Sequence, residues 1–200
     1  MNVFKAFVLF FISTSISIYG QGTQRIVQQI IDIGEVQYVH VGDHYPLDTS
    51  LNYSNFLRLS RTADLNTLTE LINHKNPVVA TYASWALIDK GYDDLNSIYL
   101  SFSKRNEKVL AHSGDLYTNE ELSDLFFFSC KRRGAKKESI ESLDSLLLNQ
   151  KSTNTYLVSV ILKKGVLNKK HNNRISELAF DDHNIDAVLY LSNWYRADYN

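Results

Sequence analysis

The segment from Asp64 to Gly91 constrains the fold most, because start and stop signals for two helices follow one another within it. Asp64 precedes an apolar run at helical spacing, where its carboxylate can accept a hydrogen bond from an otherwise unpaired backbone N–H. Asn76 and Pro77 repeat the start signal, because proline at the first helical position loses no hydrogen bond. Lys90 and Gly91 suit a helix end. The segment predicts two short helices joined by a tight turn.

Both predicted helices carry an apolar stripe, and the second stripe contains small residues that let a neighbouring helix approach closely. The stripes consist of Leu65, Leu68, Leu71 and Ile72 in the first helix, and of Val79, Tyr82, Ala83 and Ala86 in the second. We therefore expect each helix to bury one face against other helices.

This helix pair resembles a HEAT-type repeat of the armadillo-type proteins, in which antiparallel helix pairs stack into a solenoid. The residues that carry the resemblance are Leu68, Leu71, Asn76, Pro77, Val78, Val79, Tyr82, Ala83, Trp85, Ala86 and Leu87. Many such repeats have an arginine two residues after the valine of the turn, where this chain has Val79, Ala80 and Thr81. The resemblance covers the segment 64–91 and implies a fold, not a function.

Weaker copies of the unit follow along the chain. The spacing of Leu68, Leu71 and Ile72 recurs as Leu143, Leu146 and Leu147, and again as Ile175, Leu178 and Ala179. Asn76, Tyr82 and Ser84 recur as Asn184, Tyr190 and Ser192 at identical offsets. With the resemblance, these copies predict an all-α chain, a right-handed α-solenoid of about four degenerate HEAT-like helix pairs. An ordinary antiparallel helical bundle is the alternative, because it also produces such spacings.

Apolar periodicity predicts further helices over 24–33, 53–63, 93–103, 136–149, 153–164, 171–180 and 184–195. Thr118 and Glu121 match a capping box that would open another helix, and the polar stretch 104–117 before it is interpreted as an inserted loop. We divide the mature chain into an N-terminal helix, loop and cap segment over 21–63 and helical repeats over 64–200.

The segment 34–51 is harder to interpret. Val36, Tyr38 and Val41 could form a short strand, but Gly42 and Pro46 interrupt the pattern. We interpret the segment as an irregular loop that covers the end of the repeat array, since the terminal pair of a solenoid would otherwise expose its apolar face.

Residues 1–20 have the pattern of a secretory signal peptide. Lys5 supplies a positive start, the run from Ala6 to Ile12 is apolar, and Gly20 and Gly22 offer small residues for cleavage. The segment resembles signal peptides of the Bacteroidetes group, and it predicts export to the periplasm or the medium. A membrane anchor is the alternative, although the run is shorter than the ~20 apolar residues that span a bilayer.

The sequence contains no convincing catalytic or cofactor motif. His40 and His44 are four residues apart, as zinc ligands on a helix would be, but Gly42 and Pro46 argue against a helix, so they are weak metal candidates. The single cysteine, Cys130, follows an aromatic run and is expected to be a buried, inert thiol.

Charge is distributed unevenly, although the whole chain has a net charge of −1. The stretch 131–174 contains 11 Lys and Arg against 3 Asp and Glu. In a stacked array the turns of successive repeats align, so these cations could form one basic edge. The candidate residues are Lys131, Arg132, Arg133, Lys136, Lys137, Lys163, Lys164, Lys169, Lys170 and Arg174. Cations that stabilise helix ends are the equally weighted alternative.

Two functions remain open from the sequence. The first is a non-enzymatic scaffold outside the cytoplasm that binds another envelope or secreted protein, with contact to an anionic glycan or membrane surface also possible. The second is an enzyme or an accessory protein that binds a small molecule, glycan or metal through 36–51. Nucleic acid is disfavoured as a partner, because the aromatic residues fall on buried stripes and not among the basic ones.

Overall fold

The computed structural model describes residues 20–38, 51–113, 115–151, 154–163 and 167–197, and for 194–197 it describes the backbone only. Within these ranges the chain is mostly helical. The α-helices are α1 Gln21–Ile33, α2 Leu51–Thr62, α3 Leu65–Leu71, α4 Pro77–Asp89, α5 Leu95–Arg105, α6 Leu122–Arg132, α7 Lys137–Asn149, α8 Thr155–Lys163, α9 Asn172–Phe180 and α10 Ile185–Ala197. A short 3-10 helix, η2 Lys169–His171, precedes α9.

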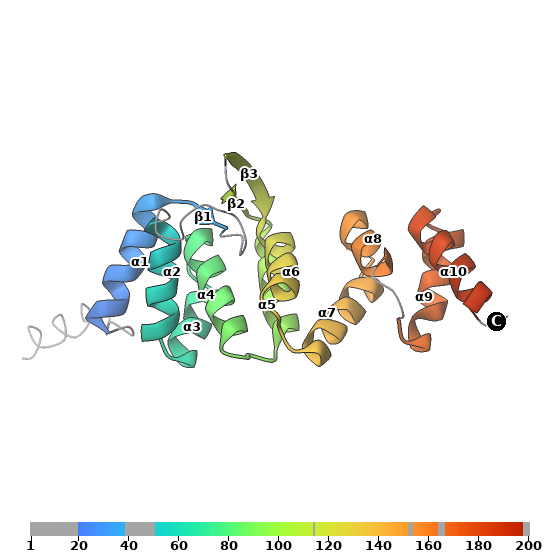
Figure 1. Ribbon diagram of the computed structural model, residues 1–200, viewed down its shortest axis with the longest axis horizontal. Coiled ribbons are helices and arrows are strands. Elements are labelled where there is room, and N and C mark those ends of the chain that lie inside the picture. The colour runs from blue at the N-terminus through green and yellow to red at the C-terminus, as the bar shows by residue number, and fades with distance from the viewer. Residues whose placement is uncertain (1–19, 39–50, 114, 152–153, 164–166, 198–200) are drawn as a thin grey trace, which may run out of the picture.

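Consecutive helices pack in pairs that follow one another along the long axis of the molecule (Figure 1). The pairs are α1 with α2, α3 with α4, α5 with α6, α7 with α8, and α9 with α10. Neighbouring pairs also touch through equivalent helices: α2 contacts α4, α4 contacts α6, α5 contacts α7, α7 contacts α9, and α8 contacts α10. Each helix pair therefore contacts the next pair along the chain.

Helix α4 is the centre of the N-terminal half. Every residue from Val78 to Ile88 is buried, as expected for a helix that is apolar on all sides. The rings of Tyr82 and Trp85 lie 5.3 Å apart and both contact Phe56 of α2, at 5.5 and 5.7 Å. Such aromatic contacts add to the free energy gained from burying apolar surface.

The helix signals of the segment 64–91 are confirmed. The Asp64 carboxylate accepts a hydrogen bond from the Thr67 N–H at 2.8 Å, and Asn76 caps α4 with Pro77 in the first turn. Gly91 has φ +74°, in the left-handed region where a side chain would be strained. The predicted helices at 24–33, 53–63, 93–103, 136–149, 153–164, 171–180 and 184–195 are also present, with ends that differ by a few residues.

The predicted loop over 104–117 is wrong, because most of it belongs to a β-hairpin. The strands β2 Lys108–Ser113 and β3 Leu116–Glu121 pair antiparallel, and β1 Val36–Gln37 pairs parallel with β2. Val109 and Ala111 are buried while the residue between them, Leu110, is exposed, which is the two-residue period of a strand. The hairpin projects beyond the helices in Figure 1.

Two more predictions are wrong for the same reason. Thr118 and Glu121 lie in β3 and form no capping box. Helix α6 starts directly after Glu121, whose side chain makes no capping hydrogen bond. Glu121 instead contacts Lys108 across the hairpin, at 3.3 Å. The interpretation of 34–51 as a loop fails at Val36–Gln37, and residues 39–50 of that segment lie outside the described residues. The described chain is mostly helical, roughly as the all-α prediction expects, with a small three-stranded sheet in addition. The division at residues 63 and 64 stays a prediction.

Candidate functional site

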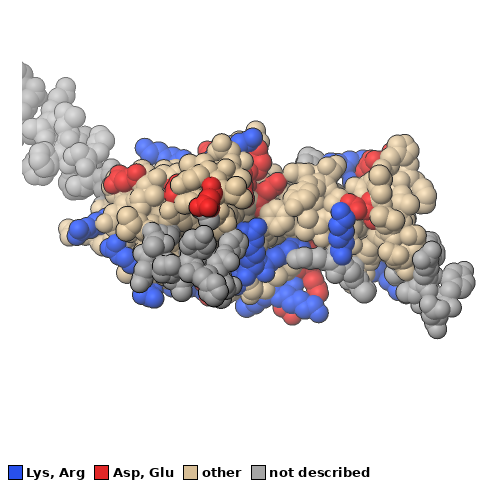
Figure 2. All heavy atoms as spheres, turned by 45° about the horizontal axis from the view of Figure 1, so that its top comes forward, with Lys and Arg blue, Asp and Glu red and all other residues tan. Residues whose placement is uncertain are grey.

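Half of the ten predicted basic residues contact acidic side chains of other helices or turns. Lys131 lies 2.8 Å from Asp144, Lys136 lies 2.7 Å from Asp93, and Lys163 lies 3.3 Å from Asp186. Arg133 pairs with Asp89 through two hydrogen bonds. Lys137 and Glu141 are 3.7 Å apart within α7. Figure 2 shows cations and carboxylates interspersed on the same face, so much of the positive charge is balanced locally.

The other predicted cations differ in their surroundings. The Arg132 guanidinium lies over the Tyr38 ring, 4.9 Å from its centroid. Arg174 donates to the Leu148 carbonyl at 3.0 Å and contacts Glu177 and Asp182. Lys169 and Lys170 belong to η2, whereas Lys164 lies outside the described residues. A continuous basic edge stays a prediction.

His40 and His44 also lie outside the described residues. The described part of that region is tightly packed. The Tyr38 ring lies 5.5 Å from that of Trp85, and its hydroxyl donates to Glu120 at 3.3 Å. Burial strongly raises the pKa of this hydroxyl. His112 lies 3.3 Å from the Glu35 carboxylate. In the described ranges no three His, Cys, Asp or Glu residues converge in a way that could hold a metal ion.

Cys130 is fully buried, as predicted, and burial raises the pKa of its thiol to about 12. The thiolate is the nucleophilic form of cysteine, so a reactive role is disfavoured at neutral pH.

Two helix pairs repeat one another in contacts as well as in sequence. Asn76 caps α4 by accepting from Val78 N–H at 2.9 Å, and Asn184 caps α10 by accepting from Ala187 N–H at 3.0 Å. The Tyr82 hydroxyl accepts from the Gln37 N–H, and the Tyr190 hydroxyl accepts from the Leu167 N–H, both at 2.9 Å. Ser84 and Ser192 each donate to the carbonyl three residues earlier. The matched offsets therefore mark equivalent positions.

The same comparison reveals an exposed apolar surface on α10. Ile185, Val188 and Leu189 of α10 are 74%, 46% and 53% exposed and follow the i, i+3, i+4 spacing of one helix face. Phe180, at the end of α9, is 69% exposed. The α4 residues at the offsets of Val188 and Leu189 are Ala80 and Thr81, and both are fully buried. We call Phe180, Ile185, Val188 and Leu189 the α10 face.

Sequence reasoning missed this face, because its apolar residues match the pattern of a helix buried in the array. The sequence signal that could have found it is the alignment of α4 with α10, in which Ala80 and Thr81 correspond to the larger apolar residues Val188 and Leu189. A helix that sits within the array needs small residues at close contacts, whereas a helix face without a neighbour does not.

Comparison of the chain with protein-family models, with curated proteins and with solved structures finds no match. Among the described helices, none combines the length and the apolarity that crossing a membrane requires.

Proposed function

We propose that this chain is an exported, non-enzymatic α-solenoid of HEAT-like helix pairs, right-handed in its stacking, that binds another envelope or secreted protein through the α10 face. The observation that carries the proposal is the exposure of Ile185, Val188 and Leu189 on a helix whose counterpart, α4, is buried on all sides. Contiguous exposed apolar side chains on a soluble protein are typical of interaction sites.

The solenoid is supported by the order of the contacts. Each helix pair touches the next through equivalent helices, and no described helix of the C-terminal pair contacts α1 to α6 strongly. Residues that join neighbouring pairs are also similar: Arg105 donates to the carbonyls of Ile72 and His74, and Arg174 donates to that of Leu148. In both cases an arginine satisfies carbonyls at the end of the first helix of the preceding pair.

The charge around the α10 face defines the kind of partner. The stretch 175–200 contains 1 Lys or Arg against 5 Asp and Glu, of which Glu177, Asp182 and Asp186 pair with Arg174 or Lys163. Asp181 and Asp182, which follow Phe180, are exposed. A helix of another protein, with an apolar stripe flanked by lysine or arginine, would complement both features.

The predicted signal peptide, whose residues 1–19 lie outside the described residues, would be cleaved close to the start of α1. This helix starts at Gln21, directly after Gly20, so cleavage there would leave it whole, whereas cleavage after Gly22 would remove its first two residues. Mass spectrometry of the protein from the cell envelope or the medium tests this, because the proposal expects Gln21 as the first residue.

Site-specific photo-crosslinking in the native cell tests the binding proposal. A crosslinker at Val188 should capture a partner protein, and digestion should map the captured peptide to an apolar helix with basic flanks. A crosslinker at Leu116, which is 71% exposed on the hairpin, is the matched control and should capture no such peptide. Replacement of Ile185 and Leu189 by serine should abolish the Val188 crosslink. Equal capture from both positions, or none from Val188, would contradict the proposal.

A further inference from the structure

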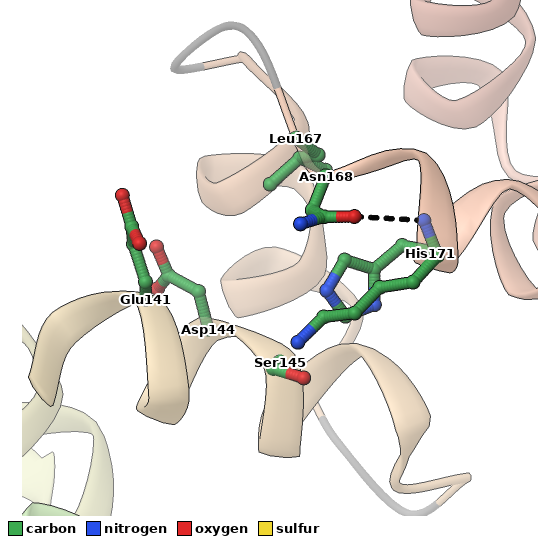
Figure 3. A pocket seen from close by; sticks show the side chains of 7 residues that line it. Glu141, Asp144, Ser145, Leu167, Asn168 and His171 are labelled. Carbon is green, nitrogen blue, oxygen red and sulfur yellow. Dashed lines mark hydrogen bonds between the residues drawn. The ribbon is translucent and has the colours of Figure 1, made fainter. Parts of the chain in front are cut away.

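A hollow lies between α7 and the turn 167–171 (Figure 3). Its volume is about 290 Å³ and its lining residues are Glu141, Asp144, Ser145, Leu167, Asn168, Lys170 and His171. This volume lies just below the ≈ 300–1,000 Å³ of sites for drug-sized ligands, so the hollow suits a smaller molecule.

The two walls of the hollow differ in charge. Helix α7 contributes the carboxylates of Glu141 and Asp144, and the facing turn contributes the Lys170 ammonium, the Asn168 amide and an imidazole. The Asn168 side chain is held in place because its oxygen accepts from the Lys170 N–H at 3.0 Å, drawn as a dashed line in Figure 3. Negative and positive groups therefore face one another across the hollow.

His171 has a buried ring nitrogen without a hydrogen-bond partner among the described residues. The residue is 5% exposed, and the nitrogen is Nδ1. Burial and the neighbouring Lys170 lower the pKa of the imidazole, so the ring is neutral at pH 7. A buried nitrogen without a hydrogen-bond partner is unfavourable, and a ligand group that reached it would remove that cost.

The carboxylate wall is only partly neutralised. Asp144 is held by the buried Lys131 ammonium at 2.8 and 3.0 Å. Among the described residues, Glu141 has one ion pair, the long contact to Lys137 at 3.7 Å between exposed groups, which has little energetic value. Glu141 is therefore the carboxylate best able to bind a new cation.

We propose that the hollow binds a free α-amino acid as its zwitterion, with the ammonium on the Glu141 and Asp144 side and the carboxylate on the Lys170, Asn168 and His171 side. The small volume and the opposed charges both select a compact molecule that carries one charge of each sign. This site does not depend on the function proposed for the α10 face, and either could fail alone.

Isothermal titration calorimetry of the purified protein tests the inference, with the common free amino acids as probes. At least one should bind with a Kd of about 1 mM or lower. Its N-acetyl and amide derivatives, which each lack one charge, should bind at least about tenfold more weakly, because each loses a charge-assisted hydrogen bond.

Three variants locate the site. Glu141→Gln should weaken binding of the zwitterion at least about tenfold but leave binding of the acetylated form unchanged. Lys170→Met should also weaken binding of the zwitterion at least about tenfold, but it should leave binding of the amide form unchanged. Glu138→Gln, an exposed change one turn earlier on α7, is the control and should have no effect. No binding by any probe, equal binding of the derivatives, or unchanged binding in both site variants would overturn the inference.

Discussion

Helices α4 and α10 have the same local design in different surroundings. In both, an asparagine caps the first turn, a tyrosine hydroxyl accepts a distant backbone N–H, and a serine donates to the carbonyl three residues before it. Helix α4 is buried from Val78 to Ile88, whereas α10 exposes Ile185, Val188 and Leu189. Local sequence signals thus specify the helix and its tertiary hydrogen bonds, while the neighbours decide which face is covered.

Substitution by aspartate at Thr81 of α4 and at Leu189 of α10 should give the largest difference in the free energy of unfolding. Thr81→Asp places a charge where the side chain is fully buried, so we expect a loss of at least about 3 kcal/mol in the free energy of unfolding. Leu189→Asp, at the same offset in α10, should change it by no more than about 0.5 kcal/mol. Urea unfolding measures both, and similar losses would mean that the two helices are equally covered.

Replacing the arginines that join neighbouring pairs should have the next largest effect. Arg105→Met removes hydrogen bonds to two carbonyls, Ile72 and His74, and should cost about 2 kcal/mol. Arg174→Met removes one carbonyl contact, to Leu148, and should cost about half as much. Lys75→Met, on the exposed turn, is the control. A larger loss for Arg174 than for Arg105 would contradict this ranking.

The two caps should behave alike despite their surroundings. Asn76→Ala and Asn184→Ala each remove an oxygen that accepts from the first turn, so each should lower stability by about 1 kcal/mol. Replacement by aspartate should restore most of it, since aspartate is an equally good cap. A cap effect confined to α4 would show that the matched asparagines are not equivalent.

Two histidines should make the protein less stable in mild acid. Burial lowers the pKa of His74, in the turn before α4, and of His171, before α9. A lowered pKa means that the unfolded chain binds the proton more tightly, so stability is intact above the unfolded value of 6.5 and falls as the pH drops below it. Thermal unfolding at pH 7.5 and 5.5 measures the loss, which His74→Gln and His171→Gln should each reduce.

The caps and buried stripes were predictable because they depend on residues within one turn of each other, as at Asp64 and Asn76. The hairpin was not, because its strands are polar and only Val109 and Ala111 are strongly buried. Its third strand, Val36–Gln37, is distant in sequence, and pairing between distant segments leaves no local signal. Thr118 and Glu121 show the ambiguity directly, since a capping-box pattern fits the end of a polar strand equally well.

The hollow beside α7 also could not be predicted from the sequence. Its carboxylates and its imidazole come from segments about 30 residues apart, and only the packing of the 167–171 turn on α7 brings Glu141 near His171. The basic residues of 131–174 are visible as a cluster in the sequence. Their ion pairs could not be predicted, because the partners Asp89, Asp93 and Asp186 lie on other elements.

Maleimide labelling of introduced cysteines tests most directly whether the α10 face is open where the α4 face is covered. The native Cys130 is buried with a raised thiol pKa, so it contributes little background in the folded protein. Ala80→Cys and Val188→Cys place thiols at equivalent offsets. We predict that Cys introduced at Val188 is labelled at the rate of an exposed thiol and becomes protected when the crosslinked partner is bound, while that at Ala80 reacts only on unfolding. Equal labelling of the two positions in the folded protein would contradict the account.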